Sequence, residues 1–190
     1  MRLGLFGGSF DPIHLGHLLV AQAALEELNL DRLYFIPASQ SPFKPGIHPA
    51  PAAHRTRMLR MALAGRSEYG VDELELHRAG VSYSVDTVRE YQRRHPTANL
   101  YWLIGADHVP TLPQWREASV LAGLVEFVVI PRPGELPAQL PLPFRLHQLG
   151  GWPLKVSSSE IRARAQAGLP IRHLLPADVS EVISGEKLYQ

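Results

Sequence analysis

The sequence predicts an α/β protein built on a doubly wound parallel sheet with helices on both faces. Short apolar runs alternate with stretches of helical periodicity along the chain, an order typical of βαβ units. Several of the runs are apolar throughout, as strands are when both faces of a sheet are covered. Glycine or proline ends most of them, so the loops after the strands should gather at one edge of the sheet, where such folds bind ligands.

Length and composition favour one globular domain over residues 1–190 and exclude several classes of protein. The hydrophobic content is 45% and the formal net charge is +1, so no charge excess favours a nucleic acid or an anionic membrane as partner. The chain has no cysteine, which excludes disulfides, thiolate metal sites and a cysteine nucleophile. We find neither a signal sequence nor an apolar run of the ~20 residues that span a bilayer, and we expect a cytoplasmic protein.

Apolar runs predict six strands. Pro37, Gly105 and Pro131 end three of them. In one run apolar residues alternate with acidic residues, which indicates a strand near the edge of the sheet, residues 71–76. The expected strands are the run that begins at Leu3 and residues 33–36, 71–76, 100–104, 125–130 and, as a weaker candidate, 144–149.

Helical spacing of apolar residues predicts five helices. Asn29 should end the first, Ser84 should cap the third, and Gly168 should end the fourth. Two proline-rich connections, residues 38–51 and 131–143, are interpreted as loops, and the length of the first favours a functional role. The expected helices are residues 15–28, 52–64, 85–94, 157–167 and 177–184.

The N-terminal stretch holds the strongest functional signal. Gly7 and Gly8 follow the first apolar strand, and glycines can take backbone angles that other residues avoid and let a ligand approach the main chain. His14 and His17 are three residues apart, so in the first turn of a helix their rings share one face. Helix N-termini attract anions, and the arrangement predicts a site for nucleotide phosphates. A lone histidine at this place would instead be a cap or a surface residue.

A second constellation lies near the C-terminus, in Ser157-Ser158-Ser159-Glu160-Ile161-Arg162. Its structural interpretation is a capping box, in which Ser157 accepts from the amide three residues on and Glu160 reaches back. Three serines at a helix start, followed by an arginine, also make a site for an oxyanion. The residues alone leave both interpretations open.

These two stretches resemble the signature motifs of the nucleotidyltransferase superfamily. His14-Leu15-Gly16-His17 fits its His-x-Gly-His motif, and Val156-Ser157-Ser158-Ser159-Glu160-Ile161-Arg162 is similar to its Ile-Ser-Ser-Thr-x-Ile-Arg motif. Within the superfamily the chain is most similar to the bacterial nicotinate-nucleotide adenylyltransferases, over nearly its full length. Further stretches that carry this resemblance are Ile36-Pro37, Lys44-Pro45, Ser82 to Thr87, Ile104 to Asp107, Trp115, Pro131 to Gly134 and Leu174 to Pro176.

The resemblance implies a Rossmann-like fold of the nucleotidyltransferase type and a direct adenylyl transfer in NAD biosynthesis. The phosphate of nicotinate mononucleotide attacks the α-phosphorus of ATP, pyrophosphate leaves and deamido-NAD forms, without a covalent intermediate. Positioning and charge neutralisation would supply most of the catalysis, since the attacking phosphate is already an oxyanion and needs no strong general base. Mg²⁺ is expected on the ATP phosphates, held mostly by ligand oxygens and water, with no metal site made of protein ligands.

By the same resemblance, His14, His17 and Arg162 are the catalytic residues, with His17 nearer to the bond that breaks. Asp107 would accept from a ribose hydroxyl or orient the adenosine, although the residue also suits a cap for the next helical turn. The other residues expected to bind ATP are Gly8, Ser9 and Phe10 through their backbone amides, and Gly105, Ser158 and Ser159.

The expected site for nicotinate mononucleotide consists of Lys44, Tyr83, Ser84 and Trp115. Lys44 would reach a phosphate from the first long loop, unless it is a solvated loop lysine. Trp115 would stack on the nicotinate ring, unless it is a core residue. Amides around Tyr83 and Ser84 would receive the nicotinate carboxylate and reject the amide form of the substrate. One departure from the family is Phe43, which stands where relatives often have a histidine.

The expected partners are ATP and nicotinate mononucleotide, with no nucleic acid and no membrane, and the sequence is compatible with a homo-oligomer. Phosphopantetheine adenylyltransferase shares the first motif but would not be expected to carry Ser82 to Thr87. Class I aminoacyl-tRNA synthetases use a related histidine motif. A chain of 190 residues with a net charge of +1 is too small and too weakly basic to include a tRNA-binding domain as well. A nucleotide-binding module without catalysis is the alternative from another class, and the intact histidine pair and Arg162 argue against it.

Overall fold

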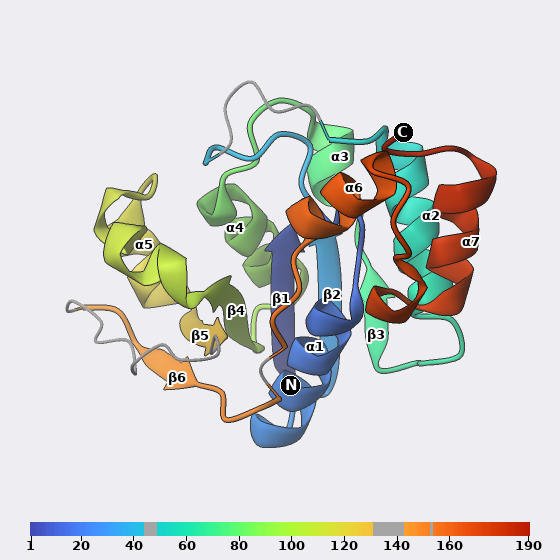
Figure 1. Cartoon of the computed structure of the whole chain (residues 1–190). Coiled ribbons are helices and arrows are strands. Elements are labelled where there is room, and N and C mark those ends of the chain that lie inside the picture. Colours follow the sequence, from blue (N-terminus) through green and yellow to red (C-terminus); the bar gives the residue numbers. More distant parts are fainter. Residues whose placement is uncertain (44–48, 131–142, 153) are drawn as a thin grey trace.

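The computed structural model describes residues 1–43, 49–130, 143–152 and 154–190. Its centre is a six-stranded sheet in the order β3-β2-β1-β4-β5-β6, in which every pair of neighbouring strands is parallel. The expected parallel sheet is thereby confirmed (Figure 1). The strands are β1 (Arg2–Gly8), β2 (Arg32–Pro37), β3 (Tyr69–Val71), β4 (Asn99–Gly105), β5 (Glu126–Ile130) and β6 (Leu146–Gln148).

The order of the strands reverses at β1. The chain runs outward from β1 to β2 and β3, then returns to place β4 on the other side of β1, and continues through β5 to β6. In parallel sheets such a reversal opens a crevice at the carboxyl ends of the two central strands, here β1 and β4. Gly8 and Gly105 are the last residues of these two strands and therefore lie at the crevice.

Helices cover both faces of the sheet (Figure 1). Strand β4 shows the reason, because Tyr101 and Leu103 belong to one hydrophobic core while Trp102 and Ile104, which alternate with them, belong to the other. The first core is completed by α1 (Leu15–Glu27), α2 (Ala52–Ala62), α6 (Ser158–Gln166) and α7 (Ala177–Gly185), and the second by α3 (Leu74–Arg78), η1 (Ala106–Gln114), α4 (Ser84–Arg94) and α5 (Ala118–Leu124). A further 3₁₀ turn, η2 (Arg172–Leu174), precedes α7.

The expected strand over residues 71–76 is wrong in its extent. Strand β3 lies at the sheet edge, as the alternation indicated, but it ends at Val71, and α3 follows. The Asp72 Oδ1 atom accepts a hydrogen bond of 3.0 Å from the Leu74 amide, which turns the chain into the helix. The alternation of apolar and acidic residues therefore came from a short strand joined to a short helix. Three other elements, η1, α5 and η2, were not expected, and Pro110 and Pro113 lie inside η1.

The helix ends agree with the sequence in two places and differ in one. Asn29 has a φ of 47° just beyond the end of α1, and Gly168 has a φ of 68° just beyond the end of α6, as αL residues do after a helix. Ser84 is not the cap of α4, because the capping position is Tyr83 and the helix begins at Ser84. Among the helices of the described ranges, none has both the length and the apolar character needed to cross a membrane.

Candidate active site

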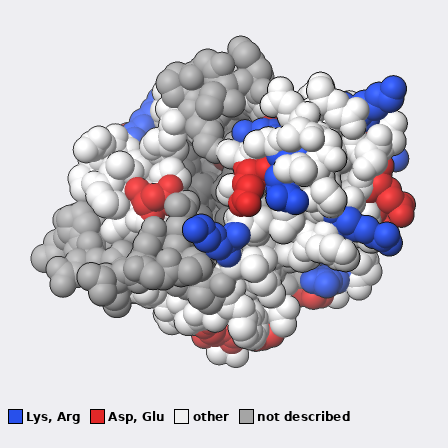
Figure 2. Space-filling view, in the orientation of Figure 1, with Lys and Arg blue, Asp and Glu red and all other residues white. Residues whose placement is uncertain are grey.

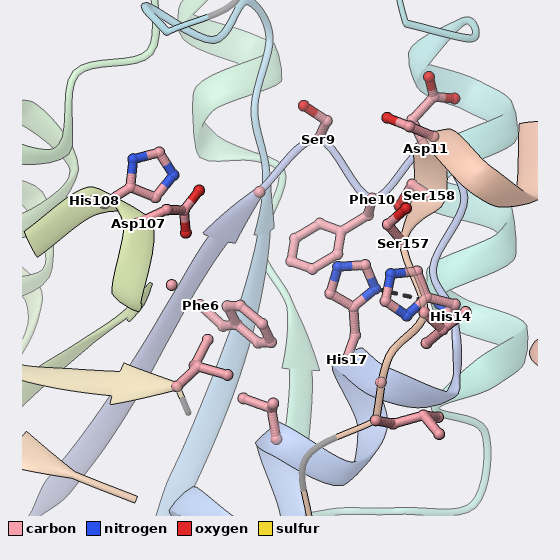
Figure 3. Close-up of a pocket in the computed structure, with 18 of the residues that line it drawn as sticks. Phe6, Ser9, Phe10, Asp11, His14, His17, Asp107, His108, Ser157 and Ser158 are labelled. Carbon is pink, nitrogen blue, oxygen red and sulfur yellow. Dashed lines mark hydrogen bonds between the residues drawn. The ribbon is translucent and has the colours of Figure 1, made fainter. Parts of the chain in front are cut away.

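A cavity of about 600 Å³ opens at the carboxyl ends of β1 and β4. It brings the two motifs of the sequence together, because His14, His17, Ser158, Ser159 and Arg162 all line it. Figure 3 shows the two histidines on one side and Asp107 and His108 on the other. The remaining residues expected to bind ATP also lie in this lining, namely Gly8, Ser9, Phe10 and Gly105.

Direct hydrogen bonds join the N-terminal turn to the start of α6. The Ser158 hydroxyl donates to the Pro12 carbonyl oxygen at 2.9 Å, and Arg162 Nη1 donates to the Asp11 carbonyl oxygen at 2.8 Å. These bonds span almost the whole chain, so the relative placement of the two motifs depends on the tertiary fold.

The two glycines at the end of β1 act differently from what the sequence suggested. Gly7 and Gly8 are strand residues, and the left-handed position of the turn is Phe10, with a φ of 46°. A Cβ atom at Gly7 would lie 3.0 Å from the Trp102 ring, and one at Gly8 would lie 3.1 Å from the Phe10 ring. The expectation of unusual glycine backbone angles is therefore wrong, and the glycines make room for aromatic side chains.

His14 and His17 form a stacked pair. Their ring centroids are 3.7 Å apart with an interplanar angle of 23° (Figure 3). The two rings lie together, as their spacing predicted, although His14 is the N-cap residue of α1 with an extended backbone and only His17 lies within the helix. Its amide donates to Nδ1 of His17 at 3.2 Å. This bond places the proton of a neutral His17 on Nε2, which is then the donor of that ring.

Burial keeps His14 neutral. The residue is 6% exposed, and desolvation lowers the pKa of its imidazole to about 4. Its Nδ1 atom has no hydrogen-bond partner among the residues that the structure describes. Gly16 permits this burial, because a Cβ atom there would lie 3.1 Å from the His14 ring.

The start of α6 has the capping bond that the serine motif predicted. Ser157 is the N-cap, and its Oγ accepts from the Glu160 amide at 3.2 Å. Arg162 Nη2 lies 3.4 Å from the Ser159 Oγ, one turn further along the helix. Because Ser158 and Ser159 also line the cavity, the capping and oxyanion-binding interpretations are compatible.

A smaller cavity of about 180 Å³ continues from the larger one and shares residues with it, among them Gly8, Ser9 and Gly105. Trp115 and Ser84 line this smaller cavity. Tyr83 lines neither of these two cavities, and the Arg116 guanidinium carbon lies 4.6 Å from the centroid of the Tyr83 ring. Lys44, also expected at the mononucleotide site, falls outside the described residues.

Aromatic side chains form one wall of the smaller cavity. The Phe43 ring centroid is 5.2 Å from that of Trp115 and 5.0 Å from that of His108. In the sequence, Phe43 stands out only as a departure from the family, and no motif indicates a role for His108. A signal existed for His108, because it follows Asp107 directly after β4.

Glu75 is a third residue of the smaller cavity that the sequence did not reveal. It is 3% exposed, and its Oε1 accepts from the Thr87 hydroxyl at 2.6 Å. Burial raises the pKa of this carboxyl, while hydrogen bonds from Thr87 and Ser82 act against that shift. The mistaken strand over residues 71–76 hid its position, because helix α3 turns it inward.

Arg55 supports the site through hydrogen bonds to main-chain carbonyl oxygens and is almost fully buried, with 2% exposure. Its Nη1 donates to the carbonyl oxygens of Ser9 at 2.8 Å and Ala38 at 3.0 Å, and its Nε donates to that of Ala50 at 2.9 Å. It therefore joins the loops that follow β1 and β2 to the segment before α2. No local signal in the sequence distinguishes Arg55 from the other arginines of α2.

The described residues form neither a surface patch of one charge on the face shown in Figure 2 nor a cluster of metal ligands. On the face shown in Figure 2, basic and acidic side chains of the described residues are interspersed among uncharged ones. Within the described ranges, no group of three or more His, Asp or Glu residues could hold a metal ion.

Comparison with known proteins agrees with this geometry. The family model described as cytidylyltransferase-like matches residues 5–164. A protein of Gemmatimonas aurantiaca is 45% identical over 100% of this chain and 93% of its own length, and one of Opitutus terrae is 40% identical over 100% and 98%. Both carry the name "Probable nicotinate-nucleotide adenylyltransferase".

Solved structures show the same fold. The nicotinic acid mononucleotide adenylyltransferase of Plasmodium falciparum, complexed with NaAD, superposes with a TM-score of 0.79 over 99% of this chain and 97% of that one, at 20% identity. The same enzyme complexed with APC gives a TM-score of 0.78. The full-length identity to the bacterial proteins, together with the shared cavity of the two motifs, establishes that the chain belongs to the nicotinate-nucleotide adenylyltransferase family, among the cytidylyltransferase-like proteins.

Proposed function

We propose that the protein transfers the adenylyl group of ATP to nicotinate mononucleotide, releasing pyrophosphate and forming deamido-NAD. One observation carries the proposal: His17 and Arg162 line a single cavity at the carboxyl ends of the central strands, and this cavity continues into a smaller aromatic one. The first has room for a nucleoside triphosphate and the second suits a flat ring. Membership of the family supports the same reaction.

The larger cavity is the proposed site of the triphosphate. A neutral His17 would donate from Nε2 to a phosphate oxygen beside the bond that breaks, and His14 would donate or accept beside it. Arg162 and the hydroxyls of Ser158 and Ser159 would hold the outer phosphates at the N-terminus of α6. The backbone amides of residues 8–10 would line the other side. The attacking phosphate needs no general base, so these contacts position the groups in line and stabilise the charge that develops.

The smaller cavity is the proposed site of the nicotinate ring. Trp115 offers its aromatic face, and Phe43 lies beside it at 5.2 Å between ring centroids. Ser84 begins α4, and amides at a helix start suit a carboxylate. An amide in place of the carboxylate would bring N–H groups against these donors, which is the proposed basis for preferring the acid. Lys44 and Tyr83 remain candidates for contacts from the surrounding loops.

Mg²⁺ is the proposed companion of ATP. Asp11 and Asp107 are the carboxylates that the described residues place in the lining of the larger cavity, and Asp11 Oδ1 already accepts from Ala50 and Tyr189. Such a donor set fits an ion held mainly by phosphate oxygens and water. When bound, the ion would neutralise part of the charge on the phosphates.

The test is pyrophosphate release from ATP in the presence of nicotinate mononucleotide, nicotinamide mononucleotide or phosphopantetheine. The proposal expects rapid release with the first substrate and slower release with the second. Release with phosphopantetheine alone would contradict the assignment of the smaller cavity. Absence of release with all three substrates would contradict catalysis and favour a binding module.

A further inference from the structure

The penultimate residue of the chain reaches into the active-site turn. The Tyr189 hydroxyl donates to Asp11 Oδ1 at 2.7 Å, and Asp11 belongs to the turn between β1 and α1. We propose that Tyr189 is a positioning residue that holds the Asp11 carboxylate away from Arg162, so that the guanidinium stays available to the phosphates of ATP. This inference rests on the proposed function of the larger cavity.

Two donors hold one oxygen of the Asp11 carboxylate. Oδ1 accepts from the Tyr189 hydroxyl and also from the Ala50 amide at 3.2 Å. The other oxygen, Oδ2, lies 3.7 Å from Arg162 Nη1, which is longer than a hydrogen bond. That same Nη1 donates instead to the main-chain carbonyl oxygen of Asp11 at 2.8 Å. The carboxylate and the guanidinium are therefore adjacent, but they are not directly hydrogen-bonded.

The environment of Asp11 favours an ion pair with Arg162 if the carboxylate is free to rotate. The residue is 5% exposed, so water screens its charge poorly, and the cations facing it are Arg162 and the buried Arg55. Rotation of the carboxylate toward Arg162 would allow a bidentate ion pair, the strongest arrangement available to these groups. Such a pair would compete with phosphate oxygens for the same guanidinium. Two hydrogen bonds to Oδ1 oppose the rotation, and Tyr189 provides one of them.

The end of the chain is itself well placed for this role. The Leu188 amide donates to the Ile183 carbonyl oxygen at 3.0 Å, and Lys187 and Tyr189 have left-handed backbones with φ values of 52° and 67°. Leu188 and Tyr189 pack against the hydrophobic core between the sheet and α7. Burial, and next the hydrogen bond to Asp11, raises the pKa of the Tyr189 phenol, so its hydroxyl keeps its proton and remains a donor.

The first experiment measures steady-state kinetics of Tyr189→Phe, which removes the hydroxyl and keeps the ring. We expect the KM for ATP to rise about tenfold, since loss of one hydrogen bond to a charged group has effects of this size. The KM for nicotinate mononucleotide should stay near the wild-type value, whereas the melting temperature should fall in this variant and in its control, because each loses a hydrogen bond to a carboxylate. The matched control is Tyr91→Phe, because the Tyr91 hydroxyl donates to Asp72 Oδ2 at 2.8 Å and Tyr91 belongs to the core on the other face of the sheet.

Inhibition by pyrophosphate and by AMP separates competition at Arg162 from general damage to the site. In Tyr189→Phe the inhibition constant of pyrophosphate should rise together with the KM for ATP, whereas that of AMP should not change. Equal weakening of AMP and pyrophosphate would overturn the inference and indicate a merely structural contact. If the wild type is active and the KM for ATP is unchanged in Tyr189→Phe, the inference about Tyr189 is wrong, whereas the proposed function still holds.

A double-mutant cycle tests the charge of Asp11 itself. In an Asp11→Asn background no carboxylate competes for Arg162, so Tyr189→Phe should add less than a further twofold rise in KM for ATP. The same tenfold rise in both backgrounds would contradict the inference. Calorimetric titration of ATP into wild type and Tyr189→Phe gives the same comparison without turnover. If the wild type shows no turnover with nicotinate mononucleotide, the proposed function fails, and an unchanged dissociation constant in that titration would overturn the inference separately.

Discussion

The ring of His14 stacks on the ring of His17 at 3.7 Å, and the amide of His14 donates to Nδ1 of His17 at 3.2 Å. The two imidazoles therefore form one unit at the start of α1, in which the backbone of one residue selects the tautomer of the other. Phe10 lies against the second ring, with 5.1 Å between the centroids, and completes an aromatic support. A donor held in this way needs no reorganisation when charge develops on a phosphate.

His17→Ala should lower kcat by about 10²–10³-fold, because it removes a donor aimed at the developing charge. The fold should persist, since the residue lies at the surface of a cavity. Steady-state kinetics with ATP and nicotinate mononucleotide measure the effect, and circular dichroism checks the fold. His173→Ala, on the exposed turn η2, is the control and should leave kcat unchanged. A kcat equal to that of the wild type in His17→Ala would show that His17 takes no part in catalysis.

The stability of the protein should depend on His14 between pH 6.5 and about pH 4. The folded-state pKa lies below the unfolded value, so the unfolded chain binds a proton first as the pH falls. Stability linked to His14 is complete above pH 6.5 and decreases toward pH 4, by as much as about 3 kcal/mol for a shift of this size. Urea unfolding of wild type and His14→Gln over this pH range measures the difference, which should shrink as the pH falls. Parallel pH profiles for the two proteins would contradict the buried neutral state.

Trp115→Ala should raise the KM for nicotinate mononucleotide and spare the KM for ATP. Trp115 lines the smaller cavity, and loss of an aromatic stacking partner corresponds to about a tenfold change in affinity. The contrasting variant is Trp152→Ala, because Trp152 lines only the larger cavity and should affect ATP instead. Steady-state kinetics with each substrate varied in turn give both KM values. A higher KM for ATP in Trp115→Ala, and for nicotinate mononucleotide in Trp152→Ala, would show that the two cavities have been assigned to the wrong substrates.

Arg55→Met should destabilise the protein by about 2–4 kcal/mol, because three carbonyl oxygens lose their buried donor and Asp11 loses a neighbouring cation. The free energy of unfolding in urea measures the loss. Arg57→Met is the matched control on the same helix; its side chain is more than half exposed and pairs with Glu186, so its removal should cost less than about 1 kcal/mol. Similar losses in the two variants would show that the buried bonds of Arg55 contribute little.

Local sequence was sufficient for much of the architecture. Apolar runs located β1, β2, β4 and β5 to within a residue or two, because central parallel strands are buried on both faces and carry few polar residues. The capping residue Ser157 and the left-handed Asn29 were also predictable, since both act within a few residues of their own helix. The short edge elements were not, because β3 and α3 are too brief for periodicity to distinguish.

The sequence by itself determined that a histidine pair and a serine–arginine helix start would flank the strands of a parallel sheet, because both are short-range patterns. Only the tertiary structure decided that Phe10, and not a glycine, takes the left-handed position of the turn, that Arg55 is buried while Arg57 is exposed, and that Tyr189 meets Asp11. Each of these depends on what packs against the residue from distant parts of the chain. Burial and long-range hydrogen bonds are properties of the assembled fold, and no local pattern encodes them.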